Sequence, residues 1–466
     1  MRRPLKIFLI MLGIASAPLA SAIDADLLVR GDYVMPMDVG DSLIEDGVVV
    51  IQGDRIAAVG PWATLSTQYR AKRVISGTGK IVMPGLINGH THTSMTLFRG
   101  MVDDLKLMDW LNNYVFPMEG RFVNPEFVRI GTELACYEMI QGGTTTFVDM
   151  YFHPDVIAGV VERCGLRAIV AAPHIDVPSP GYKGWDDSFA AAQKFVADWQ
   201  GKNSRITPAF APHSPYTVSP EHLALTAAAA KAAGAPVSIH LAEAPAETAY
   251  IRENYDTTPI QHVAATGLLD VSPIGAHMVH LSAEDIQLAA NKGVGAIHNP
   301  TSNMKLGAGV SPVPAMIAAG VNVGLGTDGA ASNNDLDMWE EIRLAALLHK
   351  LESADPTAIP APVALAMATR MGAQAIGLGD HIGQLSVGRQ ADLIQVDFSR
   401  TRQAPLYNVS SHLVYVLDSQ DVVTTVVAGR ILMENREVLT LNRKALRRGV
   451  EGIRLQIIEA LGTSTP

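Results

Sequence analysis

One pattern of residues recurs along most of the chain, between about residue 84 and residue 384. Each repeat is a helical run ended by a glycine, followed by a short apolar strand that finishes on a polar residue. Gly234 precedes Ala235-Pro-Val-Ser-Ile-His240, and Gly293 precedes Val294-Gly-Ala-Ile-His298. Glycine ends a helix readily because it adopts the left-handed backbone conformation at low cost. This alternation predicts parallel strands connected by helices.

We expect eight such strands, and they are apolar throughout because helices would cover both of their faces. The strands are expected near residues 81–88, 144–150, 166–172, 205–211, 236–240, 273–277, 294–298 and 321–327. Eight strands alternating with helices predict an α/β fold, a parallel (β/α)8 barrel of the TIM type. The alternative is an open doubly wound sheet. It would need a glycine-rich phosphate loop after its first strand, and the segment from Gly85 to His92 has no such motif.

The two flanks of this region have a different pattern. Residues 25–60 and 385–435 alternate apolar and polar side chains, as strands with one buried face do. Neither flank is long enough to build a good core alone. We therefore expect residues 23–83 and 385–440 to form one small β-sandwich beside a barrel of residues 84–384. Residues 441–466 would follow as a tail that contains a basic amphipathic helix.

The first 22 residues predict a signal peptide. Arg2, Arg3 and Lys6 precede a short apolar run, and Ala20-Ser-Ala22 supplies the small residues of a cleavage site. The apolar run is too short to span a bilayer, and no other segment approaches 18 consecutive apolar residues. We therefore expect a periplasmic or secreted protein without a membrane partner.

The amino-acid composition further limits the classes of partner that the protein can bind. The chain has 36 Lys and Arg against 46 Asp and Glu, and loss of the leader would make this balance more acidic. Such a surface disfavours nucleic acid and anionic membranes, so a small molecule is the expected partner. Cys136 and Cys164 are the only cysteines, which excludes a disulfide framework. Buried free thiols are favoured over a bridge between them, and the sequence leaves a homo-oligomer open.

Histidines and one aspartate stand where the expected strands end. His90 and His92 follow the first strand, and residues i and i+2 of an extended segment point the same way, so both imidazoles can reach one cation. His240 ends the fifth strand and Asp328 follows the eighth. The C-terminal strand ends of such a barrel meet at one mouth. We predict one divalent ion, zinc or iron(II), held by His90, His92, His240 and Asp328.

Two more polar residues are placed to move protons. Glu243 follows His240 by three residues, and His277 ends the sixth strand. When an activated water attacks a ring carbon, a base must take its proton and an acid must protonate the ring nitrogen. We assign the base to Asp328, helped by His277, and the protonation of the ring to Glu243.

Five motifs in a fixed order carry a specific resemblance. They are Pro84-Gly-Leu-Ile-Asn-Gly-His-Thr-His92, His240-Leu-Ala-Glu243, Ala276-His-Met-Val-His-Leu281, His298-Asn-Pro-Thr-Ser-Asn303 and Gly326-Thr-Asp-Gly-Ala-Ala-Ser-Asn-Asn334. Together they resemble the amidohydrolase superfamily, and within it most closely the 5′-methylthioadenosine/S-adenosylhomocysteine deaminase family. The resemblance covers nearly all of the mature chain. It implies a mononuclear metal at the four predicted ligands, with Glu243 and His277 catalytic. The expected fourth strand has no lysine, the residue that bridges the ions of two-metal relatives.

The resemblance also implies residues that hold a substrate. Glu119 and His213 match family residues that hold ribose hydroxyls, and a carboxylate can accept hydrogen bonds from two neighbouring hydroxyls. His240, Trp110 and Ser302 are the other predicted substrate contacts. Four residues could wall an apolar slot for a purine, although packing in the core explains such side chains equally well: Trp110, Phe98, Met101 and Met118.

The expected function is therefore hydrolytic deamination of an adenosine-type nucleoside, such as 5′-methylthioadenosine, adenosine or S-adenosylhomocysteine. Members that accept S-adenosylhomocysteine are expected to offer it an arginine near the loop of the third strand. Residues 173–187 contain only Lys183 as a cation, so we favour neutral nucleosides. One alternative is an s-triazine or guanine-type amidohydrolase acting on a heterocyclic amine. The other is a non-catalytic exported metal-binding protein.

Overall fold

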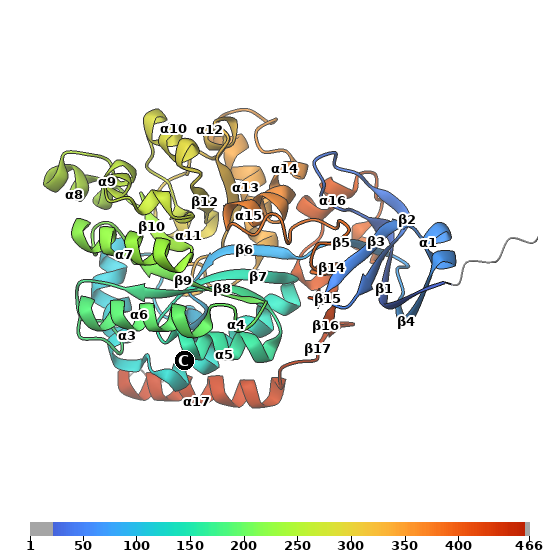
Figure 1. The fold of residues 1–466 in the computed structure, drawn as a ribbon, viewed down its shortest axis with the longest axis horizontal. Helices are drawn as coiled ribbons and strands as arrows, with labels where there is room; N and C mark the ends of the chain where they lie inside the picture. The colour runs from blue at the N-terminus through green and yellow to red at the C-terminus, as the bar shows by residue number, and fades with distance from the viewer. Residues whose placement is uncertain (1–21, 462–466) are drawn as a thin grey trace, which may run out of the picture.

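Eight parallel strands form the centre of the molecule in a computed structural model that describes residues 22–461. They are hydrogen-bonded side by side in the order of the chain, with helices packed around them (Figure 1). The strands are β6 (Leu86–Thr91), β7 (Thr144–Met150), β8 (Arg167–His174), β9 (Ile206–Pro212), β10 (Val237–Leu241), β11 (Pro273–His277), β12 (Gly295–His298) and β13 (Asn322–Leu325). The predicted (β/α)8 barrel is confirmed.

The barrel closes where its first and last strands meet. Asp328 N donates a hydrogen bond to His90 O at 3.0 Å. The Asn88 side chain bonds Thr327 twice, through Nδ2 to Oγ1 at 2.7 Å and through Oδ1, which accepts from Thr327 N at 3.1 Å. This closure brings the ends of β6 and β13 together, although they are far apart in the sequence.

The helices begin and end at signals that the sequence carries. Ser219 Oγ accepts from His222 N at the start of α7, and Gly234 ends that helix with φ of +62°. The helices are α1 (Trp62–Gln68), α2 (Leu107–Trp110), α3 (Phe116–Phe122), α4 (Pro125–Gly142), α5 (Pro154–Cys164), α6 (Trp185–Trp199), α7 (Pro220–Ala233), α8 (Pro245–Tyr255), α9 (Pro259–Ala265), α10 (Ala283–Lys292), α11 (Pro300–Lys305), α12 (Val313–Ala318), α13 (Met338–Glu352), α14 (Ala361–Met367), α15 (Arg370–Ala375), α16 (Val409–Tyr415) and α17 (Arg443–Leu461), with shorter turns η1 (Thr93–Phe98) and η2 (Leu111–Val115).

The single strand expected at residues 81–88 is wrong, because two strands occupy this segment. β5 (Lys80–Pro84) belongs to a second sheet, and β6 begins the barrel at Leu86. Gly85 lies between them, where an added Cβ would come within 2.0 Å of the Thr145 side chain. The run is apolar on both sides of this glycine, since both strands are buried, and its pattern therefore shows no boundary.

The second sheet combines strands from both flanks of the barrel, as the sequence predicts. Its nine strands run in the order β17-β16-β15-β14-β5-β1-β2-β3, with β4 beside β1. The flanks join directly where β14 pairs antiparallel with β5, Leu393 opposite Pro84. The remaining strands are β1 (Ile23–Val34), β2 (Ile44–Gln52), β3 (Arg55–Pro61), β4 (Tyr69–Ile75), β14 (Leu393–Asp397), β15 (Val422–Val427), β16 (Arg430–Glu434) and β17 (Glu437–Val438).

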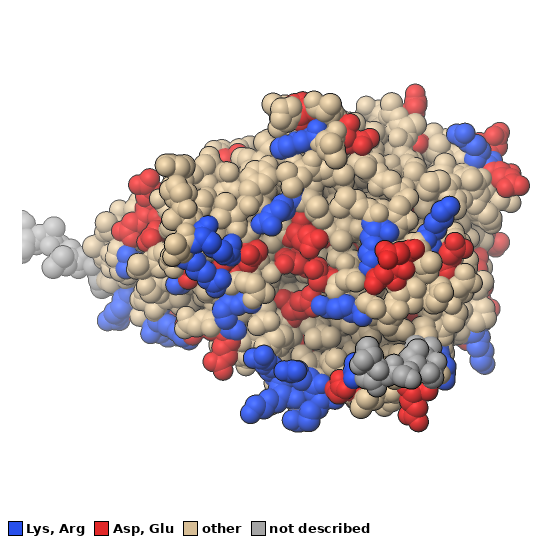
Figure 2. Space-filling model, turned by 180° about the vertical axis from the view of Figure 1, so that it is seen from behind, with Lys and Arg blue, Asp and Glu red and all other residues tan. Residues whose placement is uncertain are grey.

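The last helix, α17, lies along α4 on the outside of the barrel (Figure 1). It buries Leu446, Ile453 and Ile457, and its first turns expose basic side chains. Lys and Arg lie beside Asp and Glu over much of the face that Figure 2 shows, so this face is mixed in charge.

The described part of the chain, residues 22–461, contains no helix that combines the length and the apolarity needed to cross a membrane. Residues 1–21 lie outside this part, and with them almost the whole of the predicted signal peptide.

Candidate active site

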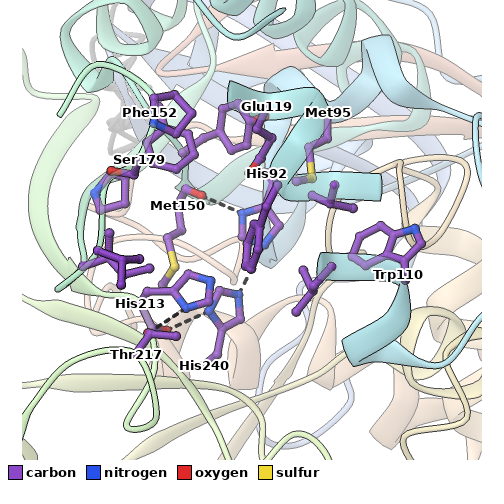
Figure 3. Close-up of a pocket in the computed structure, with 18 of the residues that line it drawn as sticks. His92, Met95, Trp110, Glu119, Met150, Phe152, Ser179, His213, Thr217 and His240 are labelled. Atoms are coloured by element: carbon purple, nitrogen blue, oxygen red, sulfur yellow. Dashed lines mark hydrogen bonds between the residues drawn. The ribbon is translucent and has the colours of Figure 1, made fainter. Parts of the chain in front are cut away.

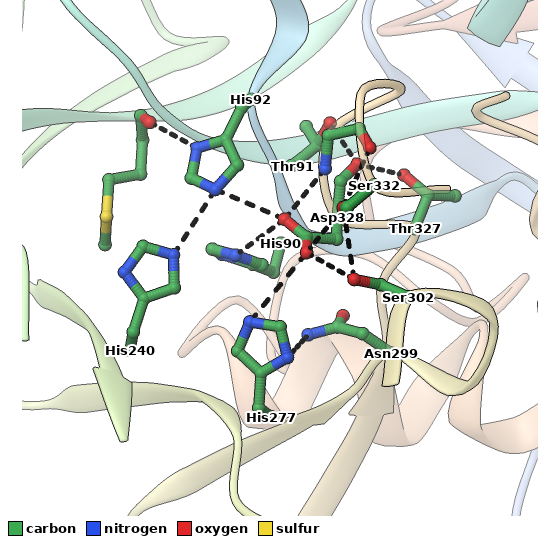
Figure 4. Close-up of polar contacts among 12 residues, drawn as sticks. His90, Thr91, His92, His240, His277, Asn299, Ser302, Thr327, Asp328 and Ser332 are labelled. Carbon is green, nitrogen blue, oxygen red and sulfur yellow. Dashed lines mark hydrogen bonds and ion pairs between the residues drawn. The ribbon is translucent and has the colours of Figure 1, made fainter. Parts of the chain in front are cut away.

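The four predicted metal ligands meet at the C-terminal mouth of the barrel (Figure 4). His90 lies near the end of β6 and His92 just beyond it, His240 lies in β10, and Asp328 follows β13. Asp328 Oδ1 is 3.4 Å from His90 Nε2 and 3.2 Å from His92 Nε2. His240 Nε2 is 3.3 Å from His92 Nε2. Two overlapping groups bring their ligand atoms within 4.8 Å of one another, His90 with His92 and Asp328, and His90 with His240 and His277.

Backbone carbonyls set the orientation of two of these rings. His92 Nδ1 donates to Met150 O at 2.6 Å, and His240 Nδ1 donates to His213 O at 2.8 Å. With the proton on Nδ1, the lone pair of His92 Nε2 faces Asp328 Oδ1 at 3.2 Å, and that of His240 Nε2 faces His92 Nε2 at 3.3 Å. Such outer hydrogen bonds fix the tautomer of a metal-binding histidine.

The donor set suits a divalent metal. His90 Nε2 is buried and has no hydrogen-bond partner among the described residues, which is costly unless another group occupies the space. Burial lowers the pKa of His90 to about 4, so its imidazole is neutral and available as a ligand at pH 7. Imidazoles converging on a carboxylate are the ligands of a borderline ion such as zinc.

Three hydrogen bonds hold the carboxylate of Asp328. Gly329 N donates to Oδ1 at 2.8 Å, and Ser302 Oγ and Ser332 Oγ donate to Oδ2 at 2.7 and 3.0 Å. Burial alone would raise the pKa of Asp328, but the close contacts with the rings of His90 and His92, at 3.4 and 3.2 Å, keep it well below its usual value. Asp328 is therefore ionised, as both a ligand and a base require.

Ser302 does not occupy the place that the sequence led us to expect. It was predicted to touch substrate, but it is fully buried, it bonds Asp328, and it is absent from the described residues that line the cavity. The structure makes it a support for Asp328, together with Ser332, which sequence reasoning missed. Both serines belong to motifs that the sequence analysis identified. Only the burial of these side chains shows that they support Asp328 and do not contact the substrate.

Glu243 lies just beyond β10 with its carboxyl group buried at the mouth. Burial raises the pKa of Glu243, which favours the protonated form that a general acid needs. Glu247 Oε1 and Oε2 accept from Ala242 N at 2.8 Å and from Glu243 N at 2.9 Å, so Glu247 anchors the backbone that carries Glu243. Sequence reasoning missed Glu247, although its place in the first turn of α8 was a usable signal.

His277, at the end of β11, lies between the two carboxyl groups. Its Nε2 is 3.7 Å from Glu243 Oε1 and 4.0 Å from Asp328 Oδ2. Its Nδ1 lies 2.9 Å from Asn303 Oδ1 and 3.2 Å from Asn299 Nδ2. In the tautomer that donates from Nδ1 to Asn303, the lone pair on Nε2 faces both carboxyl groups. Nε2 has no other hydrogen-bond partner in the part of the chain that the structure describes. This arrangement lets His277 accept a proton at Nε2.

A cavity of about 450 Å³ opens above these residues (Figure 3). Its floor is polar, and its walls are mostly apolar, with Leu107, Trp110, Phe152 and Ile175 among them. Trp110 therefore lines the cavity as predicted. Three other candidates for the wall, Phe98, Met101 and Met118, instead line a small hollow that shares Trp110 with the main cavity.

Glu119 and His213 also line this cavity. Glu119, on α3, is buried, and its Oε1 has no hydrogen-bond partner among residues 22–461. Burial raises the pKa of Glu119 to about 7 and lowers the pKa of His213 to about 3. Each side chain therefore carries a polar group, without a full charge, that a ligand in the cavity can bond. A buried polar atom without a partner in a cavity is a typical ligand contact.

Comparison with known proteins identifies the family. The model of the Amidohydrolase family matches residues 81–432, which is most of the chain. The chain belongs to the amidohydrolase family. A second model, the bacterial imidazolonepropionase-like composite domain, matches residues 47–71 of this amidohydrolase, in the second sheet.

Relatives of this amidohydrolase are similar over nearly its whole length. A 5-methylthioadenosine/S-adenosylhomocysteine deaminase from Pelotomaculum thermopropionicum is 45% identical over 91% of this chain and 96% of its own. A 5′-deoxyadenosine deaminase from Methanosarcina mazei is 43% identical over 90% and 95%. The crystal structure of an adenosine deaminase from Xanthomonas campestris with bound zinc superposes with a TM-score of 0.92 at 39% identity, covering 94% of this chain and 99% of that one. The resemblance predicted from the motifs is confirmed.

Proposed function

We propose that this amidohydrolase is a zinc-dependent deaminase that converts an adenosine-type nucleoside to the inosine-type nucleoside and ammonia. The observation that carries the proposal is the buried Oε1 of Glu119, which has no hydrogen-bond partner among the described residues and lies in the same cavity as His92, His240, Asp328 and Glu243. A buried carboxyl group above a metal and an acid suits a substrate with vicinal hydroxyls. The relatives named above deaminate such nucleosides, and one of them binds zinc.

The residues at the mouth of the barrel have separate roles in the reaction. A bound zinc ion lowers the pKa of water toward neutrality. Asp328, ionised and fixed by three hydrogen bonds, accepts the proton of the attacking water, and His277 Nε2 assists. Glu243, whose pKa burial raises, donates its proton to the ring nitrogen beside the reacting carbon. The proton held at Asp328 then passes to the amino group, which leaves as ammonia, and the proton of the new hydroxyl group returns to Glu243.

A substrate panel tests the proposal. Purified, zinc-loaded protein is expected to release ammonia from adenosine, 5′-methylthioadenosine and 5′-deoxyadenosine, with the absorbance change of adenine becoming hypoxanthine. Guanine and s-triazines are expected to give no ammonia. Turnover of either of these instead would favour the alternative amidohydrolase, and no turnover of any compound would favour a metal-binding protein without catalysis.

We expect discrimination against S-adenosylhomocysteine. Among the described residues, no Lys or Arg lines the cavity, and Lys183 is exposed outside it. The amino-acid tail of that nucleoside would place an unpaired carboxylate against apolar walls, which costs several kcal/mol. Its kcat/KM should be at least about 100-fold below that of 5′-methylthioadenosine, since each 1.4 kcal/mol is a factor of ten. Comparable values for the two substrates in the same assay would contradict this prediction.

Glu119→Gln tests the assignment of the ribose contact. Loss of a hydrogen bond to a charged or partly charged group should lower kcat/KM for adenosine by about 10- to 100-fold. The matched control is 2′,3′-dideoxyadenosine, which lacks the vicinal 2′- and 3′-hydroxyls. The kcat/KM for 2′,3′-dideoxyadenosine, which should be lower than that for adenosine in the wild-type protein, should change little in the variant. The ratio of the two kcat/KM values should therefore be smaller in the variant. An equal loss for both nucleosides would show that Glu119 acts elsewhere.

We also propose export from the cytoplasm, on the support of the signal-peptide pattern in residues 1–22. Fractionation of cells that make the protein from its own gene is expected to give a periplasmic or secreted product beginning near Ile23. A full-length product confined to the cytoplasm would be evidence against export.

A further inference from the structure

The two cysteines of the chain lie against each other, far apart in sequence but adjacent in the fold. Cys136 lies within α4, and Cys164 is the last residue of α5. Their sulfur atoms are 3.1 Å apart, both side chains are fully buried, and both are free thiols in this structure. Helices α4 and α5 pack directly on each other, and β7 lies between them in sequence. The chain thus holds its whole complement of thiols in one contact.

The arrangement of the two sulfur atoms is close to that of a disulfide bond. A disulfide needs sulfur atoms about 2.05 Å apart, so the two atoms must approach by only about 1 Å. Cys164 lies at the end of its helix, where α5 stops at Gly165 with φ of +97°, and a small shift there disturbs few backbone hydrogen bonds. Alternative partners for either thiol are excluded because the chain has no third cysteine.

We propose that Cys136 and Cys164 form an intramolecular disulfide when this protein folds in contact with a disulfide oxidant. The thiolate of Cys164 attacks one sulfur of the oxidant and releases a thiol from it. The thiolate of Cys136 then displaces the second half of the oxidant from Cys164. The two cysteines lose two electrons and two protons, and the oxidant's disulfide is reduced to two thiols.

The electrostatic surroundings favour this order of attack. Burial raises the pKa of the Cys136 thiol. Burial acts in the same direction on Cys164, but the contact with Cys136, the backbone N–H of Leu166 and the nearby guanidinium groups of Arg205 and Arg163 hold the pKa of Cys164 below its usual value. A thiol with the lower pKa supplies more of the attacking thiolate. The proposal departs from the sequence-based expectation of free thiols, because sequence alone did not place these residues in contact.

The bridge would link α5 to α4, the helix that supports the turn after the metal ligands. Helix α4 supports η1, the turn after His92, through Ser94 Oγ and Thr132 Oγ1 at 3.1 Å and through Thr96 Oγ1, which donates to Gly131 O at 2.8 Å. A link between α4 and α5 restricts the unfolded chain and leaves these native contacts unchanged. We therefore expect the disulfide to raise the stability of the folded protein and to leave its turnover unchanged.

The test compares one protein made in two compartments. Residues 23–466 are produced in the reducing cytoplasm of a bacterial host, and also behind a standard secretion signal that delivers them to the oxidising periplasm, so the result does not depend on the native leader. Each product is denatured, treated with an alkylating agent and weighed by mass spectrometry. The periplasmic protein is expected to take up no label and to be two hydrogens lighter, and the cytoplasmic protein is expected to take up two labels.

Thermal unfolding supplies the second readout. Reduction with a phosphine should lower the Tm of the periplasmic protein by about 3 °C, the size expected for a short bridged loop in a chain of this length. In Cys136→Ala and in Cys164→Ala, each made in the periplasm, the same treatment should leave Tm unchanged. Two labels on the periplasmic wild-type protein would overturn the proposal. Free thiols that persist after that protein is unfolded and refolded in the presence of oxidised glutathione would exclude the bridge altogether.

Discussion

Replacing Glu243 by glutamine is expected to lower kcat by about 1,000-fold or more and to leave the metal in place. General acid catalysis contributes about 10²- to 10⁴-fold, and the amide of glutamine has the size of the carboxyl group without its transferable proton. The backbone of residue 243 stays anchored by Glu247, so the fold of the loop should survive. Ammonia release measures turnover, elemental analysis measures zinc, and thermal unfolding measures stability.

Glu253→Gln is the matched control for this experiment. Glu253 lies on α8, which follows the same loop, and its side chain is exposed to solvent. We expect wild-type turnover, zinc content and Tm from this variant. Wild-type turnover in Glu243→Gln would refute the assignment of the ring acid. Loss of zinc from that variant would instead show that Glu243 helps to hold the ion.

Removal of the metal is expected to reduce turnover to background and to lower Tm. The mouth brings His90, His92, His240 and Asp328 together, and without an ion their lone pairs and the carboxylate face one another in a buried space. A ligand that binds only the folded state stabilises it, so a chelator should shift unfolding to lower temperature. Added zinc should restore both turnover and Tm.

His90→Ala tests the same site by removing one ligand from the protein instead of removing the ion. The variant should bind well below one equivalent of zinc, and added zinc should not restore its turnover, because one of the four ligands is gone. His381→Ala is the control, since His381 is exposed on the surface and lies outside the mouth. Full activity in chelated wild-type protein, with zinc absent by elemental analysis, would contradict the assignment of the metal site.

Much of the fold could be predicted because local chemistry and topology agree. Glycines that end helices and strands that are apolar throughout point to one architecture, and the barrel is the closed form that eight such units take. The boundary at Gly85 could not be predicted. Val82, Met83 and Leu86 are all buried, in two different sheets, so the apolar pattern has no break there.

The site was predictable where its residues are tied to strand ends. His90, His92, His240 and Asp328 project from the same end of a barrel, so strand order alone brings them together. Roles that depend on whether a side chain faces the cavity or lies behind its wall were not predictable in this way. Ser302 and Trp110 are both buried, yet one lies behind Asp328 and the other faces the cavity, and only the three-dimensional packing separates them.

The pairing of β5 with β14 has a consequence for biosynthesis. Only Gly85 separates β5 from the strand that carries His90, and the neighbour of β5, β14, follows the whole barrel in the chain. A nascent chain therefore presents the edge of β5 without this neighbour until the whole barrel has been synthesised, and unpaired strand edges invite association between chains. The strand that bears the first ligands leaves the ribosome before the rest of the barrel, but the sheet beside it is completed only after the barrel.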